Sequence, residues 1–297
     1  MFRPDFITLR IFLAVYSLGN ISKAAVRENI ASSAISKRLN ALEAELGAPL
    51  FYRHSRGVKA TPAGETLARH ALALFNQINR MTSEMSVFAS GVAGQVRMHA
   101  HTSAIVQYLP NQIASFSQSY PSVKIILVED SSAGVLQATV EGLTDIGILA
   151  GNMEFPDSVD VFDYRHDKLV ALVPATHPLS NATGVSFAET LEYDHVGLAV
   201  TSSLGTLLAG NAKALGMTLK TRIEVKTFES AVRMVEAGLG MTILPDGVLS
   251  GGAPNETARA VPLLDDWSTR AHVICVKNGC QLTTAALFML EHLRSSQ

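Results

Sequence analysis

Residues 22–61 limit the possible folds of this chain more than any other segment. Their pattern predicts two short helices, a tight turn near residues 30–32 and a basic hairpin. Apolar spacing before this segment predicts a further helix over residues 8–17, and Ser22 is placed to cap the next one. Three short helices followed by a hairpin are typical of small domains that read double-stranded DNA.

The helix after the turn has one apolar face and one polar face. Its apolar residues, at i, i+4, i+7 and i+11, define a single buried stripe: Ile35, Leu39, Leu42 and Leu46. Hydroxyls, a cation and an amide stay on the outward face: Ser32, Ser33, Ser36, Lys37 and Asn40. Such side chains can hydrogen-bond base edges and phosphates in a major groove. The alternative is that Ser32 and Ser33 only cap a helix with a solvated polar face.

The hairpin that follows is basic. Short strands over residues 50–53 and 58–60 place Arg53, Arg56 and Lys59 beside the polar helix, where a wing would grip the DNA backbone or the minor groove. Residues 1–60 hold nine Lys or Arg against four acids, a balance of +5, whereas the other 237 residues carry −7. A basic head on an acidic body is expected if only the head meets phosphates.

The head also contains a series of sequence motifs in a fixed order: the small pair AA, then SSAISKRLNALEAELGAPLF, then R, RGV and TPAG. In this order it resembles the N-terminal domain of LysR-type transcriptional regulators. The resemblance implies a winged helix-turn-helix dimer with Ser33, Ser36 and Lys37 on the reading helix and Arg53 and Arg56 on the wing.

One pair departs from the family pattern. Ala31 and Ser32 stand where the family usually has Ser-Gln, so a potential base contact is lost. The operator sequence therefore does not carry over from relatives.

A long helix is predicted from Thr61, which caps it, and Pro62, which begins it. Apolar residues then follow spacings of four and three over about three heptads: Leu67, Ala71, Leu74, Ile78, Met81, Met85 and Phe88. This regularity favours two helices wrapped together, and the resemblance implies the same. Residues 62–90 thus predict a dimer, with palindromic DNA as its partner, and the small residues at 90–94 predict a hinge.

The body, residues 95–297, alternates strand and helix patterns, which predicts an α/β fold with a mostly parallel sheet. One helix is expected over residues 103–119. Ligands of such sheets bind beyond the carboxyl ends of strands. Hydroxyls gather at three of these junctions, residues 101–103, 130–132 and 201–203, and they suit a small anion, most simply a carboxylate. The alternative for each junction is an ordinary helix cap.

Four pieces of the body resemble the effector-binding half of the same family, a two-lobed fold like periplasmic solute-binding proteins: LPNQIASFSQSYP, VEGLTDIGIL, THPLS and VEAGLGMTILP. The resemblance implies lobe I at residues 95–164 and 266–297, lobe II at 165–265, and a small-molecule inducer between them. The implied contacts are Thr102, Ser103, Ser131, Thr201, Ser202, Phe228 and Gly240. The resemblance also suggests a tetramer as the larger assembly and RNA polymerase as a further partner.

Other classes find less support. No GxSxG, P-loop or dinucleotide motif indicates an enzyme, and His99 and His101 lack a third metal ligand. No cofactor or metal is therefore expected besides the inducer. Cys275 and Cys280 are expected to be reduced thiols, with a redox-sensing pair as the alternative.

The sequence also indicates a location. No run approaches the roughly 20 apolar residues of a membrane helix, and the N-terminus has no signal-peptide pattern. The chain is therefore expected in the cytoplasm, and the basic head argues against a solute-transport component.

Overall fold

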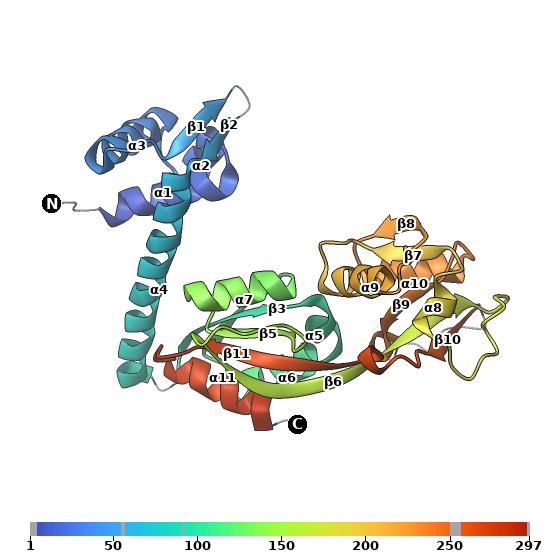
Figure 1. The fold of residues 1–297 in the computed structure, drawn as a ribbon. Coiled ribbons are helices and arrows are strands. Elements are labelled where there is room, and N and C mark those ends of the chain that lie inside the picture. The colour runs from blue at the N-terminus through green and yellow to red at the C-terminus, as the bar shows by residue number, and fades with distance from the viewer. Residues whose placement is uncertain (1–4, 55–56, 91, 250–256, 296–297) are drawn as a thin grey trace. The chain divides into compact units, whose positions relative to one another are not determined.

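The computed structural model describes residues 5–54, 57–90, 92–249 and 257–295, with backbone alone at 79–80, 82–84 and 86–90. Residues 1–82 and 83–297 form two compact units, and Figure 1 labels their helices and strands. Within the described residues, no helix is long and apolar enough to cross a membrane.

The first unit contains the predicted helices and hairpin: α1 (Phe6–Leu18), α2 (Ile21–Glu28), α3 (Ser32–Leu46), β1 (Phe51–His54), β2 (Gly57–Ala60) and the start of α4 (Pro62–Ser90). The expected cap of α2 was wrong. Asn20, not Ser22, is the N-cap, because its extended backbone lets its side chain accept a hydrogen bond from the Lys23 N–H at 3.0 Å. Ser22 already lies inside the helix.

The head has its own apolar core. The predicted stripe of α3 is confirmed: Ile35, Leu39 and Leu42 are buried against Phe12 of α1 and its neighbours. The hairpin is fixed to the turn after α1, where Gly19 has φ +58° and accepts a hydrogen bond from the Val58 N–H at 2.8 Å. A Cβ on Gly57 would lie 2.3 Å from the Gly19 carbonyl oxygen, so only glycine permits this close approach.

The start of α4 follows the prediction. The Thr61 hydroxyl accepts a hydrogen bond from the Gly64 N–H at 3.0 Å, which caps the helix, and donates to the Pro49 carbonyl at 2.6 Å. Pro62 occupies the first position of a helix of 29 residues.

The second unit contains a seven-stranded sheet, with strands β3 (Gly94–Ala100), β4 (Val123–Glu129), β5 (Ile146–Ala150), β6 (Val159–Pro174), β9 (Thr242–Pro245), β10 (Ala258–Pro262) and β11 (Thr269–Lys277). The prediction of a mostly parallel sheet was wrong. Among the described strands of this sheet, β3 alone pairs in parallel, with β4 and with β5, whereas β6 and β11 run antiparallel to each other and to their other partners. The cause is β6, whose first half gave no strand signal because charged residues interrupt it.

Two large apolar cores lie along this sheet. One packs around β3 and β5 and defines lobe I, with helices α5 (Thr102–Gln107), α6 (Leu109–Ser119), α7 (Ser132–Glu141) and α11 (Thr284–Ser295). The other packs around the second half of β6 and defines lobe II, with α8 (Phe187–Thr190), α9 (Ser203–Ala214), α10 (Phe228–Glu236), β7 (His195–Leu198) and β8 (Thr221–Val225). In Figure 1, β6 and β11 run side by side from one lobe into the other.

The helix expected over residues 103–119 is broken in two. Tyr108 leaves the helical conformation, with φ −121°, between α5 and α6. Pro110 explains the break, because proline has no N–H and is tolerated in a first turn but not inside a helix. The break lets the Tyr108 hydroxyl donate a hydrogen bond to the His166 carbonyl of β6 at 3.0 Å.

Candidate functional site

The start of α3 is an open helix end. Ala31 is its N-cap residue and makes no side-chain cap, and Ser32 and Ser33 are exposed beside it. The first backbone N–H groups of α3 thus lack an internal acceptor, and a phosphate oxygen can fill that role.

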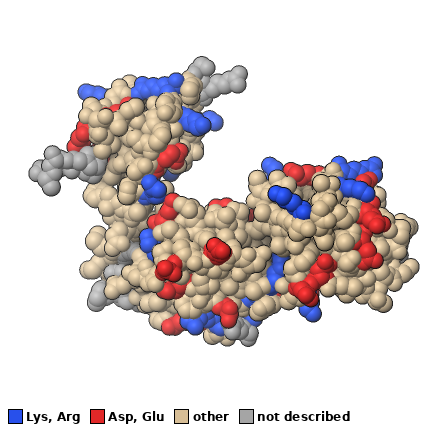
Figure 2. All heavy atoms as spheres, in the orientation of Figure 1, with Lys and Arg blue, Asp and Glu red and all other residues tan. Residues whose placement is uncertain are grey.

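The outward face of α3 is joined to the wing. Lys37 and Asn40 are exposed and Ser36 is half-buried. Arg53 of β1 donates a hydrogen bond to the Asn40 side chain, which brings the wing strand and the helix face into one surface. Arg56 lies outside the described residues. In Figure 2, Lys and Arg side chains gather over the part of the head that holds α3 and the hairpin.

The expected dimer seam lies on α4, and the exposure of its apolar side chains increases along the helix. Near the head, Ala71 is buried and Leu67 is half-buried. Further along, Ile78 is half-buried while Leu74, Met81 and Met85 are exposed, the last two by 59% and 63%. Phe88 falls where the structure describes only backbone. Large apolar side chains exposed at heptad spacing favour a partner helix.

Two cavities lie between the lobes and collect most of the predicted effector residues. The smaller, about 20 Å³, is lined by Thr102, Ser103, Ser202 and Phe228, together with Leu198, Ser203, Leu204 and Lys226. The larger, about 320 Å³, is lined by Ser131 and Thr201, together with Ser132, Ala133, Ala150, Asn152, Met153, Ser203, Thr206, Leu207 and Arg270.

Gly240, the remaining predicted contact, lines neither cavity. It has φ +147°, and a Cβ there would lie 2.7 Å from the Asp194 carbonyl oxygen. Its role is thus to let its own backbone approach the start of β7 closely.

Several cleft hydroxyls already have partners. Ser131 accepts a hydrogen bond from the Gly134 N–H at 3.1 Å, and Ser202 accepts one from the Gly205 N–H at 3.0 Å, so both act as caps. Thr102 donates to the Glu129 carboxylate at 2.6 Å. The simpler interpretation, that hydroxyls at helix starts are caps, holds for the first two residues, and any ligand contact competes with these bonds.

Ser132 and Ser203 bridge the two lobes. The Ser132 N–H at the start of α7 donates to the Ser203 hydroxyl at 2.7 Å, and the two hydroxyl oxygens lie 2.9 Å apart. The Ser132 hydroxyl also accepts a hydrogen bond from the Ala150 N–H at 3.2 Å. The N-termini of α7 and α9 thus meet directly across the cleft.

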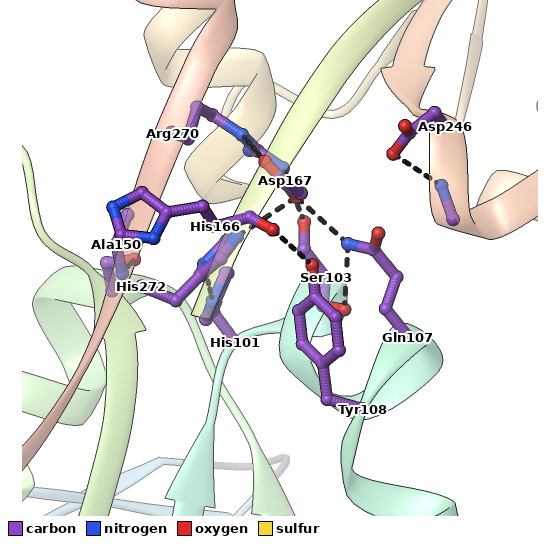
Figure 3. A network of polar contacts seen from close by, with 12 residues as sticks. His101, Ser103, Gln107, Tyr108, Ala150, His166, Asp167, Asp246, Arg270 and His272 are labelled. Carbon is purple, nitrogen blue, oxygen red and sulfur yellow. Dashed lines mark hydrogen bonds and ion pairs between the residues drawn. The ribbon is translucent and has the colours of Figure 1, made fainter. Parts of the chain in front are cut away.

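A buried polar network lies where β6 and β11 pass between the lobes (Figure 3). The Arg270 Nε donates to Asp167 Oδ1 at 2.8 Å, and its Nη2 contacts the other oxygen of the same carboxylate. His272 Nε2 lies 3.0 Å from Asp167, and His272 Nδ1 lies 3.0 Å from His101 Nε2. Gln107 of α5 donates to Asp167 at 2.9 Å.

Burial sets the charges of this network. Burial alone would raise the pKa of Asp167, but hydrogen bonds from His272 and Arg270 and the Arg270 charge hold that pKa well below its usual value. Burial, together with His272 and Arg270, lowers the pKa of His101 to about 3. The site thus holds a carboxylate against a guanidinium, with a neutral His101 beside them.

His101, His272 and Cys275 are buried in lobe I. His101 stacks on His272 at 4.9 Å between ring centroids, and the described residues contain no group of three ligands suited to a metal ion. Burial raises the pKa of the Cys275 thiol to about 11, so this thiol is poorly suited to redox sensing.

Sequence reasoning did not assign three residues of the cleft region: Lys226, Arg270 and Asp167. Lys226 directly precedes Thr227 and Phe228 at the start of α10, so a charge beside a predicted contact was visible. Arg270 and Asp167 are distant in sequence and meet only through the pairing of β6 with β11.

Together, the fold and these sites define a DNA-binding protein with a winged helix-turn-helix head and a two-lobed ligand-binding body. The model of the bacterial regulatory helix-turn-helix protein, lysR family, matches residues 6–65, and that of the LysR substrate binding domain matches residues 89–297. The chain belongs to the LysR family and is a transcriptional regulator, not an enzyme.

Similar proteins span nearly the whole chain. It is 26% identical over 288 residues to the HTH-type transcriptional regulator GltR of Bacillus subtilis, covering 96% of this chain and 95% of that protein. It is 29% identical over 276 residues to the HTH-type transcriptional regulator BenM of Acinetobacter baylyi, covering 91% and 89%.

Solved structures show the same architecture. The crystal structure of full-length BenM has a TM-score of 0.60 at 27% identity and covers 99% of this chain and 96% of that one. Full-length CbnR complexed with its target DNA has a TM-score of 0.71 at 18% identity, covering 98% and 99%. At that identity, the likeness to CbnR concerns the fold alone.

Proposed function

We propose that this regulator binds inverted repeats in promoter DNA as a symmetric dimer or tetramer, and that a small anionic inducer between the lobes changes that binding. The observation that carries the DNA-binding part is the polar face of α3, which is exposed, joined to Arg53 of the wing and open at its helix start. Exposed donors and a free helix N-terminus on one surface suit a phosphate backbone and the base edges between phosphates.

The oligomer rests on the seam of α4. Leu74, Met81 and Met85 are exposed apolar side chains at heptad spacing, and a second copy of α4 would cover them. A two-fold axis through such a pair of helices relates the two heads, so the DNA site repeats in inverted order.

The inducer part rests on the two cavities between the lobes. A ligand that prefers one arrangement of the lobes shifts the protein toward it, and its difference in binding free energy between the two arrangements sets the upper limit for the change in affinity for DNA.

Fluorescence anisotropy tests the DNA-binding part. The full chain is titrated against a labelled duplex from the promoter region of its own gene and against a random duplex of equal length, over a series of salt concentrations. We expect tighter binding to the promoter duplex and an affinity that falls with salt, because Lys and Arg release counterions from phosphates. Equal affinity for both duplexes would reject the proposal.

Analytical ultracentrifugation tests the seam. Met81→Glu places a charge in the expected helix pair and should shift the protein toward monomer. Ala73→Glu, also exposed on α4 but at position c of the heptad and away from the seam, is the matched control and should leave the oligomer unchanged. If both variants sediment as the wild type does, α4 is not the interface.

A further inference from the structure

The larger cavity between the lobes is lined by one cation and no carboxylate. Its cation is Arg270, and hydroxyls of both lobes, among them Ser131 and Ser203, complete its polar wall. The two acidic residues nearby in sequence do not line it: Glu129 accepts a hydrogen bond from the Thr102 hydroxyl, and Asp130 accepts one from the Ser131 N–H at 2.7 Å. The composition of this wall suits an anionic group.

Arg270 is held so that part of its guanidinium stays available. Only 6% of the side chain is exposed. Asp167 takes the Nε and Nη2 edge, and the Ser103 hydroxyl lies 3.3 Å from Nη2. Nη1 makes no hydrogen bond to a described residue. Two of the five donors of arginine thus remain for a ligand in the cavity.

The bridge between Ser132 and Ser203 occupies a second donor of the same wall. Ser132 is the first residue of α7, and its N–H is one of the groups that no carbonyl within the helix can accept. In this structure the acceptor is the neutral hydroxyl of Ser203 from lobe II, at 2.7 Å. An anion is a stronger acceptor than a hydroxyl at a helix N-terminus.

We propose that Arg270 selects the inducer through a carboxylate, whose oxygens accept hydrogen bonds from Arg270 Nη1 and from the Ser132 N–H and displace Ser203. This inference rests on the proposed binding of an inducer between the lobes and adds which residue recognises its charge. Binding then replaces the hydrogen bond between Ser132 and Ser203 with hydrogen bonds to the ligand. The interaction between the N-termini of α7 and α9 is weakened as a result.

Asp167 limits the strength of this subsite. Because its carboxylate already neutralises Arg270, a bare carboxylate gains from hydrogen bonds more than from net charge. We therefore expect simple carboxylates to bind weakly, and the rest of the inducer to supply further affinity in the cavity.

The test compares acetate with acetamide, its neutral isostere, on the full chain. The midpoint of thermal unfolding is measured by the fluorescence of Trp267 in lobe II, with chloride holding the ionic strength constant. Acetate should raise the midpoint above chloride and acetamide. Ser203→Ala should enlarge the acetate effect severalfold, because the competing acceptor is gone, while Ser158→Ala, an exposed serine outside the cavity, should not. Arg270→Gln should abolish the effect.

Each result decides. An equal rise with acetamide, or an acetate effect that persists in folded Arg270→Gln, overturns the proposal. If Arg270→Gln does not fold, an acetate effect that is unchanged or smaller in Ser203→Ala overturns it. Promoter binding measured on the same samples separates a failure of the role of Arg270 from a failure of the proposed function. If it is intact while acetate has no effect, only the role of Arg270 fails; if it is absent, the proposed function fails.

Discussion

The polar groups of α3 and those of the cleft differ in whether they already have hydrogen-bond partners within the protein. On α3, Ser33 and Lys37 are exposed and make no side-chain hydrogen bond to a described residue. In the cleft, Ser131 and Ser202 cap helices, and Ser203 bridges to the other lobe. A ligand of the head adds hydrogen bonds to groups that water occupied, whereas a ligand of the cleft replaces bonds within the protein.

Because of this difference, a substitution on the head should change affinity for DNA without changing folding stability, whereas a substitution in the cleft should change both ligand affinity and folding stability. Exposed polar side chains contribute little to folding, so changing them alters DNA binding alone. Buried polar groups lose a partner when a neighbour is removed, and the unpaired group destabilises the fold. The predictions below test this contrast.

The largest effect should come from the buried network. Asp167→Asn leaves the Arg270 charge without its counter-ion, and we expect the free energy of unfolding of the body to fall by about 3–5 kcal/mol. Urea unfolding followed by the fluorescence of Trp267, the single tryptophan, measures this change. Asp160→Asn, an exposed site on the same strand, should change stability by less than about 0.5 kcal/mol. Similar losses in both variants would show that the network is not special.

The second effect concerns pH. The pKa of His101 is about 3 in the fold because of burial, against about 6.5 in an unfolded chain. Between pH 6.5 and pH 3 the unfolded chain binds a proton at this residue and the folded chain does not. The contribution of His101 to the free energy of unfolding is therefore fully present above pH 6.5. Below pH 6.5 it falls by about 1.4 kcal/mol per pH unit.

The same urea assay at several pH values measures this slope. His101→Gln should reduce the slope by one proton, whereas His166→Gln, an exposed histidine on β6, should not change it. The titratable and charged groups around His101 are His272, Arg270 and Asp167, and the Asp167 carboxylate stays ionised through this range. An unchanged slope in His101→Gln would place the buried proton elsewhere.

A smaller effect should follow in the head. Lys37→Ala removes one exposed cation and should weaken promoter binding by about 1.5–3 kcal/mol, the value of a hydrogen bond to a charged group. The slope of log affinity against log salt should fall by about 0.9 per protomer if Lys37 meets a phosphate. Lys124→Ala, an exposed lysine of the body, is the control for charge alone. A stability loss in Lys37→Ala without weaker binding would contradict the contrast between head and cleft.

Local patterns predicted the head well for a physical reason. Two features show this: the buried stripe of Ile35, Leu39 and Leu42, and the cap at Thr61. Each depends on residues within a few positions of one another, so the local sequence is enough to predict it. The cap of α2 failed by two residues, because Asn20 and Ser22 are both good caps and only the chain geometry after Gly19 chooses between them.

The cleft was predictable only in part. Helix starts with hydroxyls brought Thr102, Ser131 and Ser202 into view, because strand and helix order places them at one edge. The anchor formed by Asp167 and Arg270 depends on antiparallel pairing of strands more than 100 residues apart, which no local pattern encodes. Asp167 lies in the middle of β6, and the charged residues around it, 160–168, read as a loop until β11 covers them.

The smallest effect lies at the open end of α3. Ala31 is extended, with φ −65° and ψ 139°, a conformation in which serine caps a helix. Ala31→Ser should therefore stabilise the head by about 0.5–1 kcal/mol, seen as slower amide hydrogen exchange in the first turn of α3. Ser131→Ala should give the reverse at α7, where a cap already exists. If Ala31→Ser slows exchange but weakens promoter binding, its hydroxyl competes with a DNA phosphate for the same N–H groups. If exchange is unchanged, this helix start is already satisfied, and its openness does not distinguish the head from the cleft.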